Sequence, residues 1–111
     1  DYSSGNVGIG TTNPTGLLSL AKSNADNEIY FETYDDGTSA SKLRFVKSHT
    51  DTVGTKTATI DTESYGKITW HGIDSSNALA NSAYIEAVQN GAAGASFTPT
   101  DLRFYTASAS S

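Results

Sequence analysis

Two histidines and several acidic side chains are the residues of this chain whose types suit metal binding. His49 and His71 are its only histidines, and Asp51 or Asp74 could complete a ligand set with them in a favourable fold. The chain has no His-x-x-x-His spacing, and zinc sites are commonly built on such short spacings. We therefore expect each histidine to lie at the surface or to be satisfied by hydrogen bonds. The sequence predicts no metal and no cofactor.

Paired carboxyl groups are a second chemistry to consider, because glycosidases cleave sugars between two flanking acids. The candidates share turn-like surroundings, in which a carboxylate binds its own backbone: Asp35, Asp36, Asp61, Glu63 and Asp74. No Ser-His-Asp arrangement is identifiable. Gly8-Ile9-Gly10 begins like a dinucleotide-binding fingerprint, but Asn13 occupies the third glycine position and Pro14 prevents the helix that must follow. The sequence therefore predicts that the chain is not an enzyme.

Aromatic side chains that stack on sugar rings are the third possibility. Recognition commonly resides on loops of a rigid scaffold, and the candidate glycan contacts are Tyr65, Tyr84, Asp74 and Asn77. Trp70 lies on the same face of its strand as Ile68, so we expect it in a core. Tyr84 and Tyr105 lie opposite the apolar faces of their strands, where they would either bind a ligand or pack between subunits.

Composition limits what one copy of the chain achieves alone. Only 36% of its 111 residues are apolar and it has no cysteine, so we expect a thin core without disulfides. Association with further copies is the remaining route to more buried surface. The net charge of -5 and the scattered basic residues argue against nucleic-acid binding, and no segment predicts membrane insertion. The chain has no methionine and begins Asp1-Tyr2, so we expect a piece of a longer protein.

Strand patterns dominate the elements that would position these residues. Residues 28–34 alternate, with Ile29 and Phe31 on one face, and Asp35-Asp36-Gly37 predicts a tight turn into a hairpin partner at residues 42–47, where Leu43 and Phe45 point inward. Further strands are predicted at residues 18–20, 57–60, 67–72 and 102–106. A loop is expected at residues 49–55, and turns are expected at residues 63–66 and 74–77.

Residues 78–90 are ambiguous. Their alanines, with Leu79, Glu86 and Gln89, favour a helix by propensity. The alternation of Ala83, Ile85 and Ala87 with polar neighbours also fits a strand, and the surrounding strands favour that interpretation. We predict a strand that ends at Asn90-Gly91.

The opening of the chain predicts a strand, a close backbone contact and a turn. Val7 and Ile9 alternate with Gly8 and Gly10, so one face carries branched side chains and the other is bare backbone. Asn13-Pro14 ends this strand. We divide the chain into a connecting strand and turn at residues 1–15, a β-rich domain at residues 16–106, and a flexible tail or linker at residues 107–111.

Five segments, taken in order, resemble modules of bacteriophage tail fibres. They are Gly5-Asn6-Val7-Gly8-Ile9-Gly10-Thr11, Leu43-Arg44-Phe45-Val46-Lys47-Ser48, Tyr65 to Asp74, Ala83 to Gly91, and Leu102-Arg103-Phe104-Tyr105-Thr106. No single segment is specific, but the five in this order cover most of the chain. The resemblance departs at Thr98-Pro99-Thr100, where such modules often carry Pro-Gly, and nothing resembles the self-cleaving chaperone domain that ends many fibres.

The resemblance implies an all-β module of antiparallel strands in an elongated, intertwined homotrimer located in the virion tail fibre. Its partners would be copies of itself and neighbouring fibre modules, and its function would be a rod segment that supports host attachment. The alternative is a carbohydrate- or receptor-binding domain at the fibre tip, with host surface polysaccharide as a partner. The residues expected to form the core or trimer contacts are Val7, Ile9, Leu18, Leu20, Ile29, Phe31, Leu43, Phe45, Ile68, Trp70, Ile85, Leu102 and Phe104.

Overall fold

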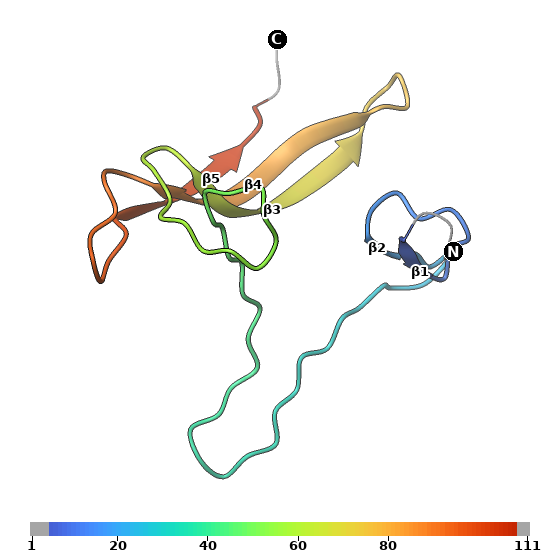
Figure 1. Ribbon diagram of the computed structural model, residues 1–111. Coiled ribbons are helices and arrows are strands. Elements are labelled where there is room, and N and C mark those ends of the chain that lie inside the picture. The colour runs from blue at the N-terminus through green and yellow to red at the C-terminus, as the bar shows by residue number, and fades with distance from the viewer. Residues whose placement is uncertain (1–4, 109–111) are drawn as a thin grey trace. The chain divides into compact units, whose positions relative to one another are not determined.

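The computed structural model describes residues 5–108, and every regular element within that range is a strand (Figure 1). This confirms the all-β prediction. The chain divides into two compact units, Asp1–Lys42 and Leu43–Ser111. Residues 1–4 of the predicted connecting segment and residues 109–111 of the predicted tail lie outside the described range. Within that tail, the Ala107 amide donates a hydrogen bond to the Ser82 carbonyl at 2.8 Å.

The first unit contains a short parallel ladder. Strand β1 (Val7–Ile9) pairs with β2 (Leu18–Leu20), so that Val7 is level with Leu18 and Ile9 with Leu20. The ladder continues past β2, where the Ala21 amide donates to the Ile9 carbonyl at 2.9 Å. Both strands were predicted, but their parallel direction departs from the antiparallel expectation.

Gly10 confirms the close backbone contact expected from the opening motif. Its φ is +78°, a left-handed value that side chains rarely adopt, and a Cβ atom there would collide with the Ala21 carbonyl oxygen. The glycine therefore allows the chain to turn out of β1 while the backbone after β2 approaches it. The Val7 and Ile9 side chains remain exposed in the single chain.

The predicted hairpin of residues 28–34 and 42–47 is wrong, because neither segment forms a strand (Figure 1). The tip explains part of the difference. Gly37 does not take a positive φ, which a tight two-residue turn requires, and instead the Asp35 carboxylate accepts a hydrogen bond from the Ser39 amide at 3.0 Å. The Ser39 and Gly37 groups hold the pKa of Asp35 below its usual value. A longer, carboxylate-centred turn does not align two strands.

Side-chain burial does not stabilise residues 28–34 as a strand either. Ile29 is 60% exposed and Phe31 is 57% exposed, so the described part of the first unit leaves the alternating apolar face largely open. An isolated two-stranded hairpin is marginal in water even with a good turn. The only side-chain hydrogen bond described between residues 28–34 and residues 38–42 joins the Thr33 and Ser41 hydroxyls at 2.6 Å.

The second unit is built on an antiparallel sheet in the order β3-β4-β5, formed by β3 (Ser64–Ile73), β4 (Leu79–Gln89) and β5 (Thr100–Thr106). The predicted strands at residues 67–72 and 102–106 are confirmed. The segment at residues 78–90 is a strand, as we predicted, and not a helix. Its alternation prevails over the helical propensity of its alanines because it lies between two hydrogen-bonded neighbours.

The turn between β3 and β4 follows the prediction for residues 74–77. Its centre is the Asp74 carboxylate, which accepts hydrogen bonds from the Ser76 amide at 2.8 Å, the Ser76 hydroxyl at 2.6 Å and the Ala78 amide at 3.0 Å. Asn77 has a φ of 63°, which asparagine tolerates better than most residues. These bonds, led by the Ser76 hydroxyl, lower the pKa of Asp74.

Two predictions beside the sheet are wrong. Residues 57–60 form no strand, and β3 already begins at Ser64, within the segment expected to be a turn. The reversal lies earlier, where Thr62 has a φ of 69° and its amide donates to the Gln89 carbonyl at 3.0 Å. The chain around Thr59 is instead fixed by the Gln89 side chain, whose Nε2 donates to the Thr59 carbonyl at 3.3 Å.

The buried centre of the second unit is small and largely polar. Val88 is its buried apolar side chain, and the buried polar residues are Thr59 and Gln89. Gln89 is 1% exposed and all of its side-chain atoms are paired. Its Oε1 accepts from the Tyr65 hydroxyl at 2.8 Å, and its Nε2 also donates to the Gly91 carbonyl at 2.8 Å. The Gln89 side chain therefore connects the end of β4 to Tyr65 in β3, to the chain at Thr59 and to Gly91.

Candidate functional site

The register of the sheet places most of its bulky apolar side chains on one face, whereas Val88, which is level with Asp101, lies on the other. Ile68 is level with Ile85, and Ile85 with Phe104, while Trp70 is level with Ala83. Residues that are level with one another share a face. We call this surface the apolar face; its residues are Ile68, Trp70, Ala83, Ile85, Ala87, Leu102 and Phe104.

The large side chains at the two outer strands of the apolar face remain exposed in the described part of the second unit. Trp70 is 51% exposed and Phe104 is 73% exposed, although both were expected in a core or a trimer contact. Phe45 lies against one edge of this face at Gly66, where a Cβ atom would come within 2.7 Å of the Phe45 side chain. Gly66 is level with Ala87, so Phe45 meets this same face. Large contiguous apolar surfaces of this kind mark interaction sites in soluble proteins.

The opposite face of the sheet is polar and internally paired. The Lys67 ammonium lies 3.4 Å from a Glu86 carboxylate oxygen and 4.3 Å from the centre of the Tyr84 ring. The rings of Tyr84 and Tyr105 stack at 4.8 Å with an interplanar angle of 9°. Hydrogen bonding from the Ser64 hydroxyl, together with Lys67, lowers the pKa of Glu86. We call this surface the polar face; it is adapted to solvent, whereas the apolar face is not.

The predicted glycan contacts do not converge on one place. Tyr65 lies at the start of β3, and its hydroxyl is bonded to the buried Gln89 amide. Asp74 and Asn77 form the turn beyond the far end of β3, which a strand rise of about 3.3 Å per residue places roughly 30 Å from Tyr65. Tyr84 lies on the polar face between them. These four residues therefore form no common site.

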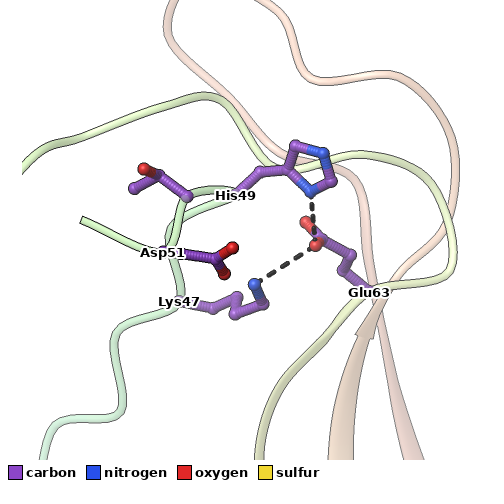
Figure 2. Close-up of a pocket in the computed structure, with 5 residues that line it drawn as sticks. Lys47, His49, Asp51 and Glu63 are labelled. Carbon is purple, nitrogen blue, oxygen red and sulfur yellow. Dashed lines mark hydrogen bonds and ion pairs between the residues drawn. The ribbon is translucent and has the colours of Figure 1, made fainter. Parts of the chain in front are cut away.

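A shallow hollow of about 300 Å³ lies beside the sheet, and it is lined by Lys47, His49, Thr50, Asp51 and Glu63. Figure 2 shows Lys47 and His49 directed at the Glu63 carboxylate. His49 Nδ1 and Lys47 Nζ lie 2.7 Å and 3.2 Å from Glu63 Oε1. The other oxygen accepts a hydrogen bond from the Ile60 amide at 3.0 Å.

The charged groups of this hollow have a structural role, and we call the contacts of Glu63 with Lys47, His49 and Ile60 the Glu63 tie. Hydrogen bonding from His49, followed by the Ile60 amide and Lys47, lowers the pKa of Glu63 to about 2. Glu63 thereby fastens the loop after Lys47 to the residues that lead into β3. The part of the chain that the structure describes holds no cluster of three or more histidine or acidic side chains suited to a metal ion. His71 lies on β3, level with Asn81, and does not line this hollow.

Three of the other acidic residues singled out from the sequence accept hydrogen bonds from backbone groups. Asp61 Oδ1 accepts from the Gly91 amide at 2.6 Å and from the Thr62 amide at 3.0 Å. Asp35 and Asp74 organise their own turns, as described above. No two of these carboxyl groups meet across a hollow that is described for this chain.

Sequence reasoning missed Gln89 and the tie at Glu63. Gln89 carries a detectable signal, because it continues the alternation of Ala83, Ile85 and Ala87 and so occupies an inward position. Glu63 carries none, since its partners Lys47 and His49 are brought to it by a loop whose path the sequence does not indicate.

Comparison with models of known protein families and with curated proteins found no match to this chain. Among the described residues, no helix is long and apolar enough to cross a membrane.

Proposed function

We propose that this chain is a structural module of a bacteriophage tail fibre, which forms a homotrimeric rod segment that supports attachment to the host. The observation that carries the proposal is the uncovered apolar face on an otherwise ordered sheet. Trp70, Leu102 and Phe104 are held at fixed positions by the backbone ladder, yet the described part of the second unit leaves more than half of each residue exposed. The likeness of five sequence segments to tail-fibre modules supports the choice of a fibre over other assemblies.

The size of the exposed surface area supports association between copies. The chain exposes 9362 Å², whereas two separate compact units of this combined size expose about 7,000 Å². The excess of about 2,400 Å² exceeds the roughly 1,600 Å² that one copy buries in two interfaces of standard size. A closed trimer gives each copy two such interfaces. This surplus is large enough for the assembly, and it is shared between the apolar face and the exposed residues 21–47.

The arrangement of charge supports the same function. With the apolar faces turned toward neighbouring copies, the polar faces, with their Lys67–Glu86 and Arg103–Asp101 pairs, become the outside of the rod. Such a module works mechanically: it connects neighbouring fibre modules and transmits host contact, and it has no chemical step.

The mass of the chain in solution tests the proposal. We expect light scattering after gel filtration at micromolar concentration to give three times the mass of one chain, with a melting temperature that falls on dilution. A compact single chain whose melting temperature does not depend on concentration would exclude a trimeric module.

A carbohydrate-binding domain at a fibre tip is the second candidate. The stacked Tyr84–Tyr105 pair on the polar face favours it, because Tyr105 is half exposed and its ring is held rigid by Tyr84. Its test is binding of the assembled protein to a panel of host polysaccharides, with Tyr105→Ala as the comparison. Equal signals from the two proteins would remove this candidate.

A further inference from the structure

The two outer strands of the sheet have open edges that run in the same direction. Strands β3 and β5 are each antiparallel to β4, so they are parallel to each other. In the described part of the chain, each of them is hydrogen-bonded to β4 alone. Open edges of this kind are templates for pairing with another chain. Each of them can therefore accept an edge strand of a second copy.

The largest side chains of the apolar face lie on the two edge strands. Its large side chains on β3 are Ile68 and Trp70, and those on β5 are Leu102 and Phe104. Between them, β4 contributes the small residues Ala83 and Ala87 beside Ile85. A strand of a second copy that pairs with either edge would place its own apolar side chains beside these large side chains and cover them.

Symmetry determines which edges can meet. A threefold axis that runs along the strands keeps their direction, so it brings the β5 edge of one copy to the β3 edge of the next as a parallel pair. Such a contact between unlike surfaces closes into a ring after three copies. A twofold axis would instead bring like edges together, β5 to β5 or β3 to β3, as an antiparallel pair.

The register between copies is limited by the alternation of side chains. Only even shifts keep both apolar faces on the same side. With no shift, the row Lys67–Glu86–Arg103 continues into Lys67 of the next copy, which sets two cations side by side. That register also places Leu102 level with Gly66 of the next copy, where Phe45 of that copy already occupies the space over the glycine.

A shift of two residues resolves both conflicts. It places Asp101 level with Lys67 of the next copy and pairs opposite charges on the polar face. On the apolar face it places Leu102 level with Ile68 and Phe104 level with Trp70 of the next copy. A shift of two in the other direction carries Trp70 beyond Thr106, the end of β5. Charge and apolar matching thus select the same register.

We propose that β5 of one copy pairs in parallel with β3 of the next, with Asp101 level with Lys67 and Phe104 level with Trp70. This inference rests on the proposed trimer and specifies its contact. The three sheets then form one continuous sheet around the threefold axis, with the apolar faces inside. The open edges of the single chain become interior ladders of the assembly.

Engineered disulfides test the pairing directly, because the chain contains no cysteine. In the proposed register Thr69 is level with Arg103 of the next copy, and both lie on the polar face. Within one copy these positions are on strands two apart, about 9.6 Å from each other or more, which is too far for a disulfide. The variant Thr69→Cys/Arg103→Cys should therefore oxidise to a covalent trimer on a non-reducing gel.

Matched variants separate the alternatives. His71→Cys/Tyr105→Cys tests the same register one level further along, in case the first pair disturbs folding. Lys67→Cys/Arg103→Cys should cross-link poorly, because its positions are level only without a shift. Arg103→Cys alone would cross-link only if the β5 strands of two copies met. In the proposed arrangement it should therefore remain uncross-linked.

Each outcome decides the proposal once light scattering has given the mass of the reduced proteins. Covalent trimers from the two in-register pairs support it. Dimers from Arg103→Cys alone, or faster cross-linking of the Lys67→Cys/Arg103→Cys pair, overturn it. A trimer in which neither in-register pair cross-links overturns the edge pairing and leaves the proposed rod module standing. A single chain before oxidation overturns the module itself.

Discussion

Residues 28–34 and β5 carry the same alternation of apolar and polar side chains, yet only β5 is a strand. Side-chain burial does not separate them, because Leu102 and Phe104 are 61% and 73% exposed, against 60% and 57% for Ile29 and Phe31. The difference is the neighbour. β5 pairs with β4, which is already held by β3, whereas residues 28–34 have no such partner. In this chain a fixed backbone ladder decides which alternating segment becomes a strand.

The comparison also explains why both segments leave apolar surface open. The ladder orders β5 without covering its side chains, and the missing ladder leaves residues 28–34 without either kind of support. β5 therefore lacks only a cover for its side chains, whereas residues 28–34 lack both the cover and the ladder, and the following changes test this difference.

The largest effect is expected from a charge on the apolar face. Trp70→Asp would bury a carboxylate in the proposed contact between copies, and truncating a central interface tryptophan alone typically costs 2 kcal/mol or more. We expect the affinity between copies to fall by about 100-fold or more, so that light scattering gives the mass of one chain. Asn81→Asp, an exposed position on the central strand β4, is the control. A Trp70→Asp protein that remains a trimer would show that the apolar face makes no contact.

The second largest effect is expected inside the second unit. Gln89→Leu removes three side-chain hydrogen bonds and leaves the Tyr65 hydroxyl and the Thr59 and Gly91 carbonyls without this partner. We expect a loss of about 2 to 4 kcal/mol in the free energy of unfolding, because unpaired buried groups keep their desolvation cost.

Urea unfolding followed by the fluorescence of Trp70 measures this loss, and Tyr65→Phe is the graded control. It removes one of the three bonds and should cost about 1 kcal/mol. Equal stability of the Gln89→Leu and wild-type proteins would show that the amide is not the centre of this unit.

A smaller effect, dependent on pH, is expected at the Glu63 tie. Its pKa is lowered from 4.5 to about 2 in the folded chain, led by the hydrogen bond from His49. A depressed carboxyl pKa contributes stability that is present above the unfolded value and is lost as the pH falls through the folded value. Glu63→Gln should therefore lower the melting temperature at pH 6, and the difference from wild type should shrink between about pH 4.5 and 2.

Melting curves across this range, with Asp51→Asn as the control from the same hollow, provide the measurement. A difference between Glu63→Gln and wild type that stays constant down to pH 2 would mean that the ionised carboxylate does not form the tie.

The sequence allows most of the second unit to be predicted. Alternation indicated β3 and β5, and Asp74 with Asn77 indicated the turn between β3 and β4, because an aspartate followed by small polar residues satisfies its own backbone. The same local signals misplaced the hairpin at residues 28–47, where Asp36-Gly37 has turn chemistry but no third strand supports the ladder. Local pattern predicts which segments can be extended, but not which of them find a partner.

The candidate sites were less predictable for the same reason. The shared face of Ile68 and Trp70 follows from strand period alone, and the register confirms it. The glycan candidates rest on residue type, and nothing local shows that Tyr65 and Asp74 lie at opposite ends of one strand. The Glu63 tie depends on where a loop returns, so its partners could not be identified from spacing.

The smallest effect is expected in residues 28–34. Thr33→Val removes the hydroxyl pair with Ser41, and because that pair is exposed we expect the free energy of unfolding to change by less than about 0.5 kcal/mol. Hydrogen exchange gives the sharper measurement. In the monomeric Trp70→Asp background, amides 28–34 should exchange almost unprotected while those of β4 exchange most slowly, because exchange follows the ladder. Protection of residues 28–34 in that monomer would mean that the segment already has a neighbour, and the contrast with β5 would be wrong. Protection that appears only in the assembled wild type would locate the missing neighbour in another copy.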